Sequence, residues 1–328
     1  MTRPIFPVRL LALDLDGTIL GPDRVISPRV RHAIEEAQRA GVIVTIATGR
    51  MYRSAVPFAW ALGLTAPIVC YQGAYVREVA PAGGGIGAGT IVGTSASAST
   101  AGLGDAGDAG RGGPAAAGVA AREGLAAAGA NDDAGGCLLY HRTMSGAAAR
   151  DAIRWSRDRG FDPHVNIHDR LVMEAGATSA EDYERLAGIG AQFVPDLLAA
   201  VRGPVTKVLA VGPAPLPERS LADARLDFAG RAQVTVSHPE YLEWNAPGVT
   251  KGRAVRWLAR HLGIAPGQVM AVGDQYNDAE MLAEVGHGVA MGGAPEAVRA
   301  AARHVTAPFE SDGAALAIEA LVLGREAA

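Results

Sequence analysis

The sequence predicts an α/β protein in which a doubly wound, Rossmann-like parallel sheet is interrupted by a second, α+β domain. Short apolar runs alternate with helical segments over the first 80 residues and again from residue 250 onward, as in right-handed parallel crossovers. Between these stretches the order strand, helix, strand, strand occurs twice, which favours one antiparallel sheet with helices on one face. We therefore expect a discontinuous core at residues 1–79 and 246–328 and an inserted domain at residues 80–245.

The first half of the core is predicted as strand, helix, strand, helix, strand. The run LLALDL at residues 10–15 is continuous and apolar, as in a strand buried on both faces. Ser27 and Pro28 open the first helix as N-cap and first helical residue, and Gly41 ends it. The elements that follow are a strand at 42–47, a helix at 50–62 and a strand at 67–71.

Residues 81–136 differ from the rest because they are almost wholly Gly, Ala, Ser and Thr. Such a composition cannot bury enough apolar area to offset chain entropy, so we expect a flexible insertion. A Gly-rich phosphate loop is the alternative, but no strand–turn–helix pattern flanks the segment. The rest of the inserted domain is predicted to contain strands at 137–141, 165–167, 171–174, 205–211, 234–237 and 241–244, and helices at 147–159 and 220–228.

The parallel pattern resumes in the second half of the core. Thr250 is a suitable N-cap for a helix that runs to residue 262. A buried strand is predicted next, and a closing helix ends the domain. These and the intervening elements are expected at residues 269–272 (strand), 278–285 (helix), 288–291 and 304–306 (strands) and 313–323 (helix).

Composition and charge exclude several classes of protein. Hydrophobic residues make up 49% of the 328, enough for a sizeable core, which excludes a disordered chain. The formal net charge of −4 offers no basic field, so we expect neither a nucleic-acid nor a membrane partner. The sequence has two cysteines and no recognisable targeting or membrane-spanning segment, so we expect a cytoplasmic protein. The sequence does not determine its oligomeric state.

Lysine is rare in this chain. Of the 30 basic residues, Lys207 and Lys251 are the two lysines. Where a chain otherwise uses arginine, a lysine indicates a site that needs the compact ammonium group rather than the planar guanidinium. For Lys207, chance is an equally good explanation.

Polar residues follow the predicted core strands where those strands end. Because open α/β sheets bind ligands at the carboxyl ends of their strands, we expect these residues to meet. Asp14 and Asp16 sit two apart on extended chain and so point the same way, and Gly17 permits a sharp turn after them. The four groups are Asp14 to Thr18 (DLDGT), Thr48-Gly49-Arg50, Lys251, and Gly273 to Asp278 (GDQYND).

Together these groups predict phosphoryl-transfer chemistry. Several carboxylates crowded together repel one another unless a hard cation binds among them. Oxygen ligands without a nearby Cys or His favour Mg²⁺ over zinc. A cation, a lysine and backbone N–H donors are what a phosphoryl group with spread negative charge requires.

On these motifs the sequence resembles the haloacid dehalogenase-like phosphatases, specifically the Cof-type branch. The resemblance rests on DLDGT, on ATGR at residues 47–50, and on YLEWNAPGVTKGRA around Lys251. GDQYNDAEML from residue 273, VAMGGA from residue 289 and VTAPFESDGAALAI from residue 305 complete the pattern. Two departures are Gln72, where Asn is usual, and Gly293, where Asn is common.

The resemblance implies roles for the core residues. Asp14 would be the nucleophile that forms an aspartyl-phosphate, and Asp16 the acid that protonates the leaving alcohol and then activates water. Thr48 and Lys251 would hold the phosphoryl oxygens, aided by backbone N–H groups near Gly17 and Gly49. Mg²⁺ would be bound by Asp14, the carbonyl of Asp16, and Asp274, with Asn277 and Asp278 behind.

The same resemblance implies a C2B-type cap, built of αββ repeats, that selects the leaving group. For each single candidate below, ordinary packing on the surface or within the cap sheet is the alternative to substrate contact. The candidates for substrate contact are Arg50, His164, His168, Asp169, Glu174, Lys207 and Glu243. The expected function is a Mg²⁺-dependent phosphomonoesterase acting on a small phosphorylated metabolite, most simply a sugar phosphate. A phosphohexomutase-like phosphotransferase and a catalytically silent phosphometabolite-binding protein are the alternatives.

Overall fold

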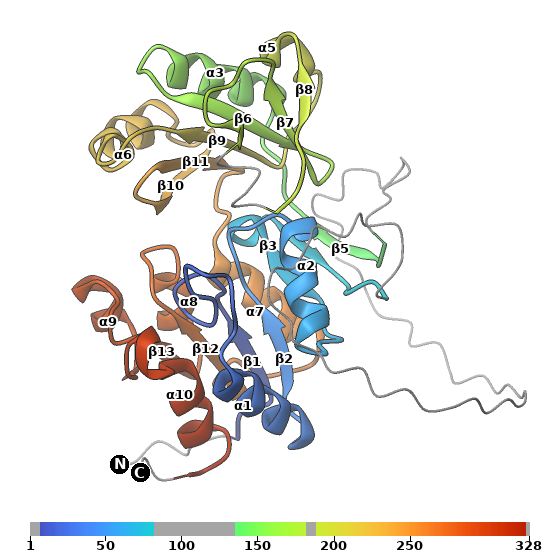
Figure 1. The fold of residues 1–328 in the computed structure, drawn as a ribbon, viewed down its shortest axis with the longest axis vertical. Coiled ribbons are helices and arrows are strands. Elements are labelled where there is room, and N and C mark those ends of the chain that lie inside the picture. Colours follow the sequence, from blue (N-terminus) through green and yellow to red (C-terminus); the bar gives the residue numbers. More distant parts are fainter. Residues whose placement is uncertain (1–6, 82–134, 182–187, 326–328) are drawn as a thin grey trace, which may run out of the picture.

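The computed structural model describes residues 7–81, 135–181 and 188–325, and its core is built on a parallel sheet. The sheet has five strands in the order β14-β13-β12-β1-β2, and every neighbouring pair is parallel. The first strand of the chain thus lies beside strands from its last quarter, which confirms the doubly wound prediction (Figure 1). The strands are β1 (Leu10–Leu13), β2 (Ile43–Ile46), β12 (Val269–Gly273), β13 (His287–Ala290) and β14 (His304–Val305).

Helices cover both faces of this sheet. Successive side chains of a strand point to opposite faces, so β1 contributes Leu11 and Leu13 to one hydrophobic cluster and Leu10 and Ala12 to another. The first cluster includes residues of α1 (Pro28–Arg39) and α10 (Gly313–Leu321). The second includes residues of α7 (Lys251–His261), α8 (Ala279–Glu284) and α9 (Glu296–Ala301).

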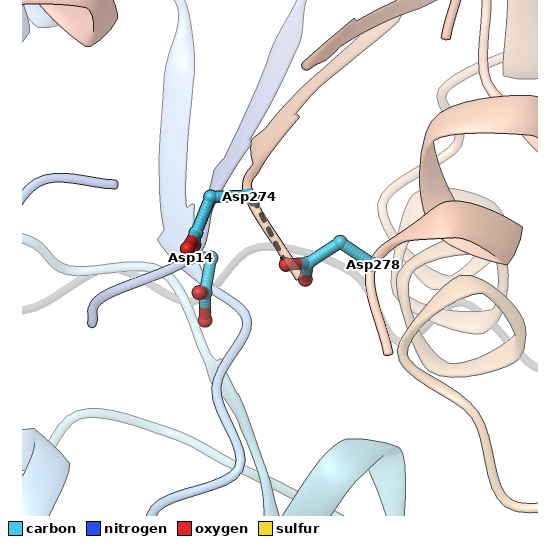
Figure 2. Close-up of side chains that lie close together, drawn as sticks. All are labelled: Asp14, Asp274 and Asp278. Carbon is cyan, nitrogen blue, oxygen red and sulfur yellow. Dashed lines mark hydrogen bonds between the residues drawn. The ribbon is translucent and has the colours of Figure 1, made fainter. Parts of the chain in front are cut away.

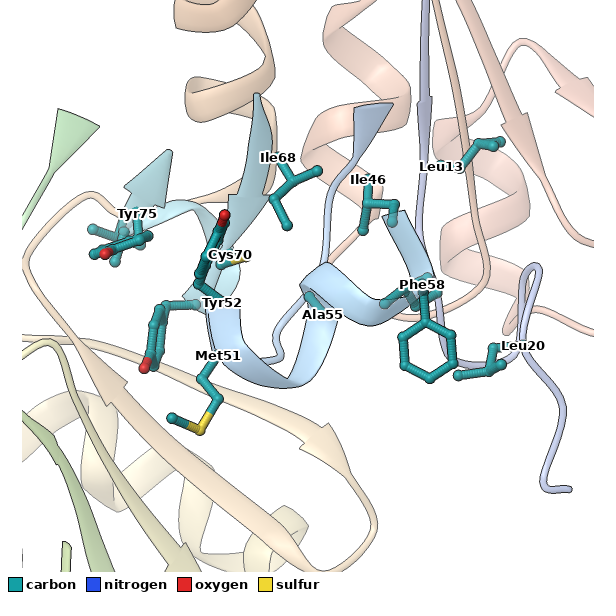
Figure 3. Packing of buried hydrophobic residues seen from close by; sticks show 14 of the residues in the cluster. Leu13, Leu20, Ile46, Met51, Tyr52, Ala55, Phe58, Ile68, Cys70 and Tyr75 are labelled. Atoms are coloured by element: carbon teal, nitrogen blue, oxygen red, sulfur yellow. The ribbon is translucent and has the colours of Figure 1, made fainter. Parts of the chain in front are cut away.

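The helix α2 (Tyr52–Ala61) packs beside β2 and β3 (Ile68–Cys70). Figure 3 shows Tyr52, Ala55 and Phe58 along this helix, among other residues of the same hydrophobic cluster. All three are buried. This packing fixes the point at which the chain leaves β2 and enters α2, which is where Thr48, Gly49 and Arg50 lie.

The inserted domain is a second sheet with helices on one face. Its six strands run in the order β10-β11-β9-β6-β7-β8. Trp155 of α3 stacks edge-on against Trp244 of β11, with ring centroids 5.5 Å apart, so the helices cover the face that is turned away from the core (Figure 1). The elements are β6 (Asp162–Ile167), β7 (Arg170–Glu174), β8 (Gln192–Val194), β9 (Lys207–Val211), β10 (Gln233–His238), β11 (Tyr241–Asn245), α3 (Gly146–Arg157), α5 (Leu197–Ala200) and α6 (Leu216–Asp227).

The predicted topology misses three strand pairings. The strand expected at 137–141 is β5 (Leu138–His141), which pairs with β4 (Tyr75–Arg77) and not with the cap sheet. β3 does follow β2 in parallel, through the bridge between Ala47 and Val69, but its antiparallel pairing with β4 was not predicted. The parallel pair β7–β8 was not predicted. Each depends on pairing between distant segments, which local periodicity does not encode.

The Gly/Ala-rich insertion expected at 81–136 lies outside the described residues except at its two ends. Three short 3₁₀ helices complete the described chain: η1 (Tyr71–Gly73), η2 (Pro266–Gln268) and η3 (Phe309–Ser311). None of the helices in the described part of the chain combines the length and the hydropathy that crossing a bilayer would require.

Candidate active site

A cavity of about 610 Å³ lies between the carboxyl ends of the core strands and the cap sheet. It brings together residues from segments that are far apart in the sequence. Of the predicted core residues, those that line it are Asp14, Asp16, Gly17, Thr48, Gly49, Arg50, Lys251, Asp274 and Asn277. The expectation that these residues meet at one edge of the sheet is therefore confirmed.

The turn after β1 places Asp14 at the floor of the cavity. The Leu15 carbonyl accepts hydrogen bonds from the backbone N–H groups of Thr18, Ile19 and Leu20, at 3.2, 3.0 and 2.8 Å. Gly17 has φ of +82°, and a Cβ atom there would lie 2.4 Å from Oδ2 of Asp274. Glycine is therefore required both for the turn and for the close approach of the two loops.

Lys251 lies between two buried carboxylates. It is the first residue of α7, and the hydroxyl of Thr250 caps that helix by accepting from the N–H of Arg253 at 3.2 Å. Its Nζ donates to Oδ1 of Asp14 and to Oδ1 of Asp278, each at 2.7 Å. Burial acts to lower the pKa of Lys251, but the two carboxylates outweigh it and raise that pKa.

The loop after β12 is held by hydrogen bonds to its own carboxylates. Oδ2 of Asp278 accepts from the N–H groups of Asp274 and Gln275, at 3.1 and 3.0 Å. Oδ1 of Asp274 accepts from the Thr18 hydroxyl at 3.0 Å, and its Oδ2 accepts from Nε2 of Gln275 at 3.0 Å. Figure 2 shows the result: Asp274 and Asp278 point from this loop toward Asp14.

The three aspartates form an acidic cluster. One carboxylate oxygen of each of Asp14, Asp274 and Asp278 lies within 4.8 Å of the others. Burial and the charge of Asp278 raise the pKa of Asp14 well above its usual range. The same two causes raise the pKa of Asp274 to about 6. Ionised side by side, these carboxylates therefore need added positive charge.

The cluster fits a divalent cation. Three carboxylates and the one ammonium of Lys251 leave an excess of two negative charges, all on hard oxygen donors of the kind Mg²⁺ prefers. Oδ1 of Asn277 is buried and has no hydrogen-bond partner among the described residues, as suits an oxygen that would meet a metal-bound water.

Asp16 lies apart from this cluster and pairs with Arg50. Its side chain is 54% exposed. Nε of Arg50 donates to Oδ2 of Asp16 at 2.7 Å, and Nη2 donates to Oδ1 at 2.5 Å. The N–H of Arg50 donates to the Thr48 hydroxyl at 3.1 Å, which orders the loop that begins α2. Sequence reasoning proposed Arg50 as a substrate contact and did not predict this ion pair.

Two of the cap candidates face the cavity. Lys207 and Glu243 line it and form an ion pair of 2.9 Å, with each side chain 3% exposed.

The other cap candidates are engaged elsewhere. His164 bonds the Ser179 hydroxyl at 2.7 Å, and the Glu174 carboxylate pairs with Arg157. Asp169 accepts from the first N–H groups of α2, those of Tyr52 at 2.9 Å and Arg53 at 3.2 Å. His168 precedes it in the turn between β6 and β7. Substrate contact by these four residues is not supported.

Several residues that line the cavity were missed. His238, which no sequence motif singled out, lies at the cavity wall with its side chain 48% exposed. Gln72 was noted only as a departure from the family pattern. Five further lining residues were given no role: Arg24 and Ser237 lie outside the quoted motifs, whereas Tyr241, Phe309 and Glu310 lie inside them.

The chain is similar to known phosphatases over most of its length. The family model of the haloacid dehalogenase-like hydrolases matches residues 11–82 and 123–318. The chain is 27% identical over 286 residues to the HMP-PP phosphatase of Serratia proteamaculans, covering 87% of this chain and 84% of that protein. It is 24% identical over 330 residues to the 5-amino-6-(5-phospho-D-ribitylamino)uracil phosphatase YitU of Bacillus subtilis, covering 93% and 94%.

The fold is similarly shared. The crystal structure of a haloacid dehalogenase-like hydrolase from Bacteroides thetaiotaomicron superposes with a TM-score of 0.70 at 23% identity, covering 95% of this chain and 98% of that one. The family model spans the core loops that carry Asp14, Thr48, Lys251 and Asp274 as well as most of the cap. This chain therefore belongs to the haloacid dehalogenase-like hydrolases.

Proposed function

We propose that the protein is a cytoplasmic, Mg²⁺-dependent phosphomonoesterase that acts through an aspartyl-phosphate at Asp14. The observation that carries the proposal is the position of Asp14: its carboxylate lies in the cavity, 2.7 Å from Nζ of Lys251, beside two further carboxylates. A nucleophile, a phosphate-binding cation and a set of metal ligands are thereby within reach of one phosphoryl group.

In the first step, a carboxylate oxygen of Asp14 attacks phosphorus in line with the ester bond. The new bond joins Asp14 to the phosphoryl group, and the bond between phosphorus and the leaving oxygen breaks. Asp16 gives its proton to that oxygen, so the product leaves as a neutral alcohol. The half-exposed side chain of Asp16 lines the cavity, and its pairing with Arg50 sets its orientation there.

In the second step, water attacks phosphorus and the bond to Asp14 breaks. Asp16 takes the proton from the water, which restores both carboxyl groups and releases inorganic phosphate. Lys251 and the Thr48 hydroxyl hold the phosphoryl oxygens throughout, because both line the cavity next to Asp14. Asp14, Asp274 and the Asp16 carbonyl would hold Mg²⁺, which when bound neutralises charge that develops on the phosphoryl oxygens.

The proposed substrate is a small sugar phosphate or a related polyol phosphate. A cavity of about 610 Å³ accommodates a phosphate monoester of metabolite size. Its lining combines apolar side chains with polar ones, and the polar ones include Arg24, Ser237 and Glu243. The B. subtilis relative is named for a phosphoribityl ester, which is an ester of this kind.

The experiment is phosphate release from a panel of phosphate monoesters, with and without Mg²⁺, using Asp14→Asn as the blank. We expect release that needs Mg²⁺ and disappears in the variant, because the amide retains the size of the side chain and loses the nucleophile. Transfer of phosphate to a second sugar position without release would indicate a mutase. Binding of the esters without either reaction would indicate a silent binding protein, and both results would contradict the proposal.

A further inference from the structure

The two lysines of this chain meet at the same cavity. Lys251 has a place in the proposed reaction. Lys207 lies at the start of β9 on the opposite wall, and the proposed reaction does not use it. Its ammonium donates to Oε1 of Glu243 at 2.9 Å and to the carbonyl oxygen of Gly49 at 3.3 Å. Gly49 belongs to the loop expected to bind phosphate, so Lys207 lies where a leaving group would emerge from that site.

Strand geometry places Lys207 and Glu243 on the cavity face of the cap sheet. β9 and β11 are antiparallel neighbours in which Glu243 is opposite Leu209 and Asn245 is opposite Lys207. Lys207 and Glu243 are therefore diagonal neighbours on one face. Leu209 and Tyr241, on the same alternation, also line the cavity, whereas Trp244 packs against α3 on the far face.

Stability of the fold is a poor explanation for this ion pair. Both side chains are 3% exposed, and removing two charges from water costs about as much as their attraction returns. An apolar pair of similar volume is often as stable or more so. Because this charged pair lies in the wall of a cavity, interaction with a polar ligand bound in that cavity is the better explanation.

Two core residues hold the Glu243 carboxylate in a fixed orientation. Nε2 of Gln72 donates to Oε2 of Glu243 at 3.0 Å, and Nδ2 of Asn277 donates to Oε1 of Gln72 at 2.8 Å. The Gln72 amide lies against the backbone of Gly49, where a Cβ atom would come within 2.4 Å of Nε2. Oε2 of Glu243 thus accepts from Gln72 and Oε1 accepts from Lys207, and each oxygen has a second lone pair for a ligand.

We infer that Lys207 and Glu243 form a recognition site for two hydroxyl groups on adjacent carbons of the leaving alcohol. Glu243 accepts a hydrogen bond from one hydroxyl, and Lys207 donates to the oxygen of the other. An anchored acceptor and donor 2.9 Å apart match the spacing of such a pair of oxygens. An ester whose alcohol lacks hydroxyls leaves both charged groups without that ligand, and sites of this kind reject such analogues strongly.

This inference rests on the proposed function, because it assigns specificity to the same site. It is tested with two esters of equal chain length, ribitol 5-phosphate and pentyl phosphate, which differ in their hydroxyl groups. The measured quantity is the ratio of their kcat/KM values in the wild type, Glu243→Gln, Lys207→Met and the control Glu174→Gln. Glu174 is a cap carboxylate that pairs with Arg157 and does not line the cavity.

We expect the wild type to prefer ribitol 5-phosphate, and the ratio to fall about 10- to 100-fold in Glu243→Gln and in Lys207→Met, since each loses a hydrogen bond to a charged group. The Glu174→Gln ratio stays at the wild-type value. Equal losses on both esters would assign the pair a purely structural role and overturn the inference. An unchanged ratio in both cap variants would overturn it as well.

A second measurement does not depend on turnover or on the variants folding. With two lysines, ¹³C-lysine labelling of the Asp14→Asn protein yields two sets of side-chain resonances. We expect ribitol 5-phosphate to shift both sets, and pentyl phosphate to shift that of Lys251 while leaving Lys207 close to its ligand-free position. Identical shifts of Lys207 with the two esters would overturn the inference. Hydrolysis of neither ester by the wild type would instead count against the proposed function.

Discussion

Arg50 holds both carboxylate oxygens of Asp16, with Nε 2.7 Å from Oδ2 and Nη2 2.5 Å from Oδ1. The guanidinium also contacts an aromatic ring, since its Cζ lies over the Phe58 ring, 5.5 Å from the ring centroid. A guanidinium that binds both oxygens of a carboxylate fixes the orientation of the carboxylate and also stabilises its negative charge. Arg50 is therefore a positioning residue for the proposed acid.

Arg50→Lys should lower kcat more than it changes KM. Lysine keeps the positive charge but lacks the planar fork, so Asp16 loses its fixed orientation and kcat should fall about 10- to 100-fold. The matched control is Arg29→Lys, which removes a similar bidentate pair with Glu319 that does not line the cavity. Steady-state kinetics on one ester decide the matter, and equal kcat values for wild type and Arg50→Lys would contradict the assignment.

Lys251→Met should destabilise the protein as well as abolish turnover. Without the ammonium, the buried carboxylates of Asp14 and Asp278 have no cation between them, and breaking such an arrangement costs about 3–5 kcal/mol. Urea unfolding at pH 7 without divalent cations measures this loss. Arg253→Met, on the exposed side of the same helix, should change the free energy of unfolding by less than about 0.5 kcal/mol. Equal stability of the two variants would count against the buried ion pairs.

His164 should make stability depend on pH. Burial lowers its pKa to about 4, whereas an unfolded histidine titrates near 6.5. Between these values the unfolded chain binds more protons than the folded one, so stability falls as pH drops from about 6.5 to about 4. The contribution is at most about 3 kcal/mol. In His164→Gln the free energy of unfolding should vary less over this range, and identical pH profiles for variant and wild type would refute the prediction.

Deleting residues 84–133 should leave a soluble, folded protein. The two ends of this segment are joined by described contacts: Arg77 donates to the carbonyls of Gly135 and Gly136 at 2.6 and 3.1 Å, and β4 pairs with β5. The remaining residues between Pro81 and Gly135 suffice for a turn. Gel filtration and circular dichroism of the shortened chain test this, and aggregation would show that the segment contributes to folding.

The core was predictable because each of its signals is local. Burial on both faces makes β1 continuously apolar, and its residues do divide between two hydrophobic clusters. The rule that ligands bind at the carboxyl ends of parallel strands then brings Asp14, Thr48 and Asp274 together without any coordinates. Nothing local distinguishes β5 from a cap strand, however, because its partner is β4 across the Gly/Ala-rich segment.

The finer contacts of the site were not predictable for the same reason. Gln72 reaches Glu243 across 171 residues. It does so from a backbone conformation with φ of +59°, which is uncommon for a residue other than glycine. Asp16 and Arg50 were each singled out, but their pairing depends on how the turns after β1 and β2 are placed side by side.

During turnover, Asp14 should carry the phosphoryl group as a covalent intermediate. The direct test mixes the wild-type enzyme with excess phosphate ester and Mg²⁺, quenches the reaction with acid within milliseconds, and measures the mass of the peptide that contains Asp14. We predict that this peptide gains the mass of one phosphoryl group in the wild type and gains nothing in Asp14→Asn. An unmodified peptide under rapid turnover, together with an active Asp14→Asn variant, would contradict the account.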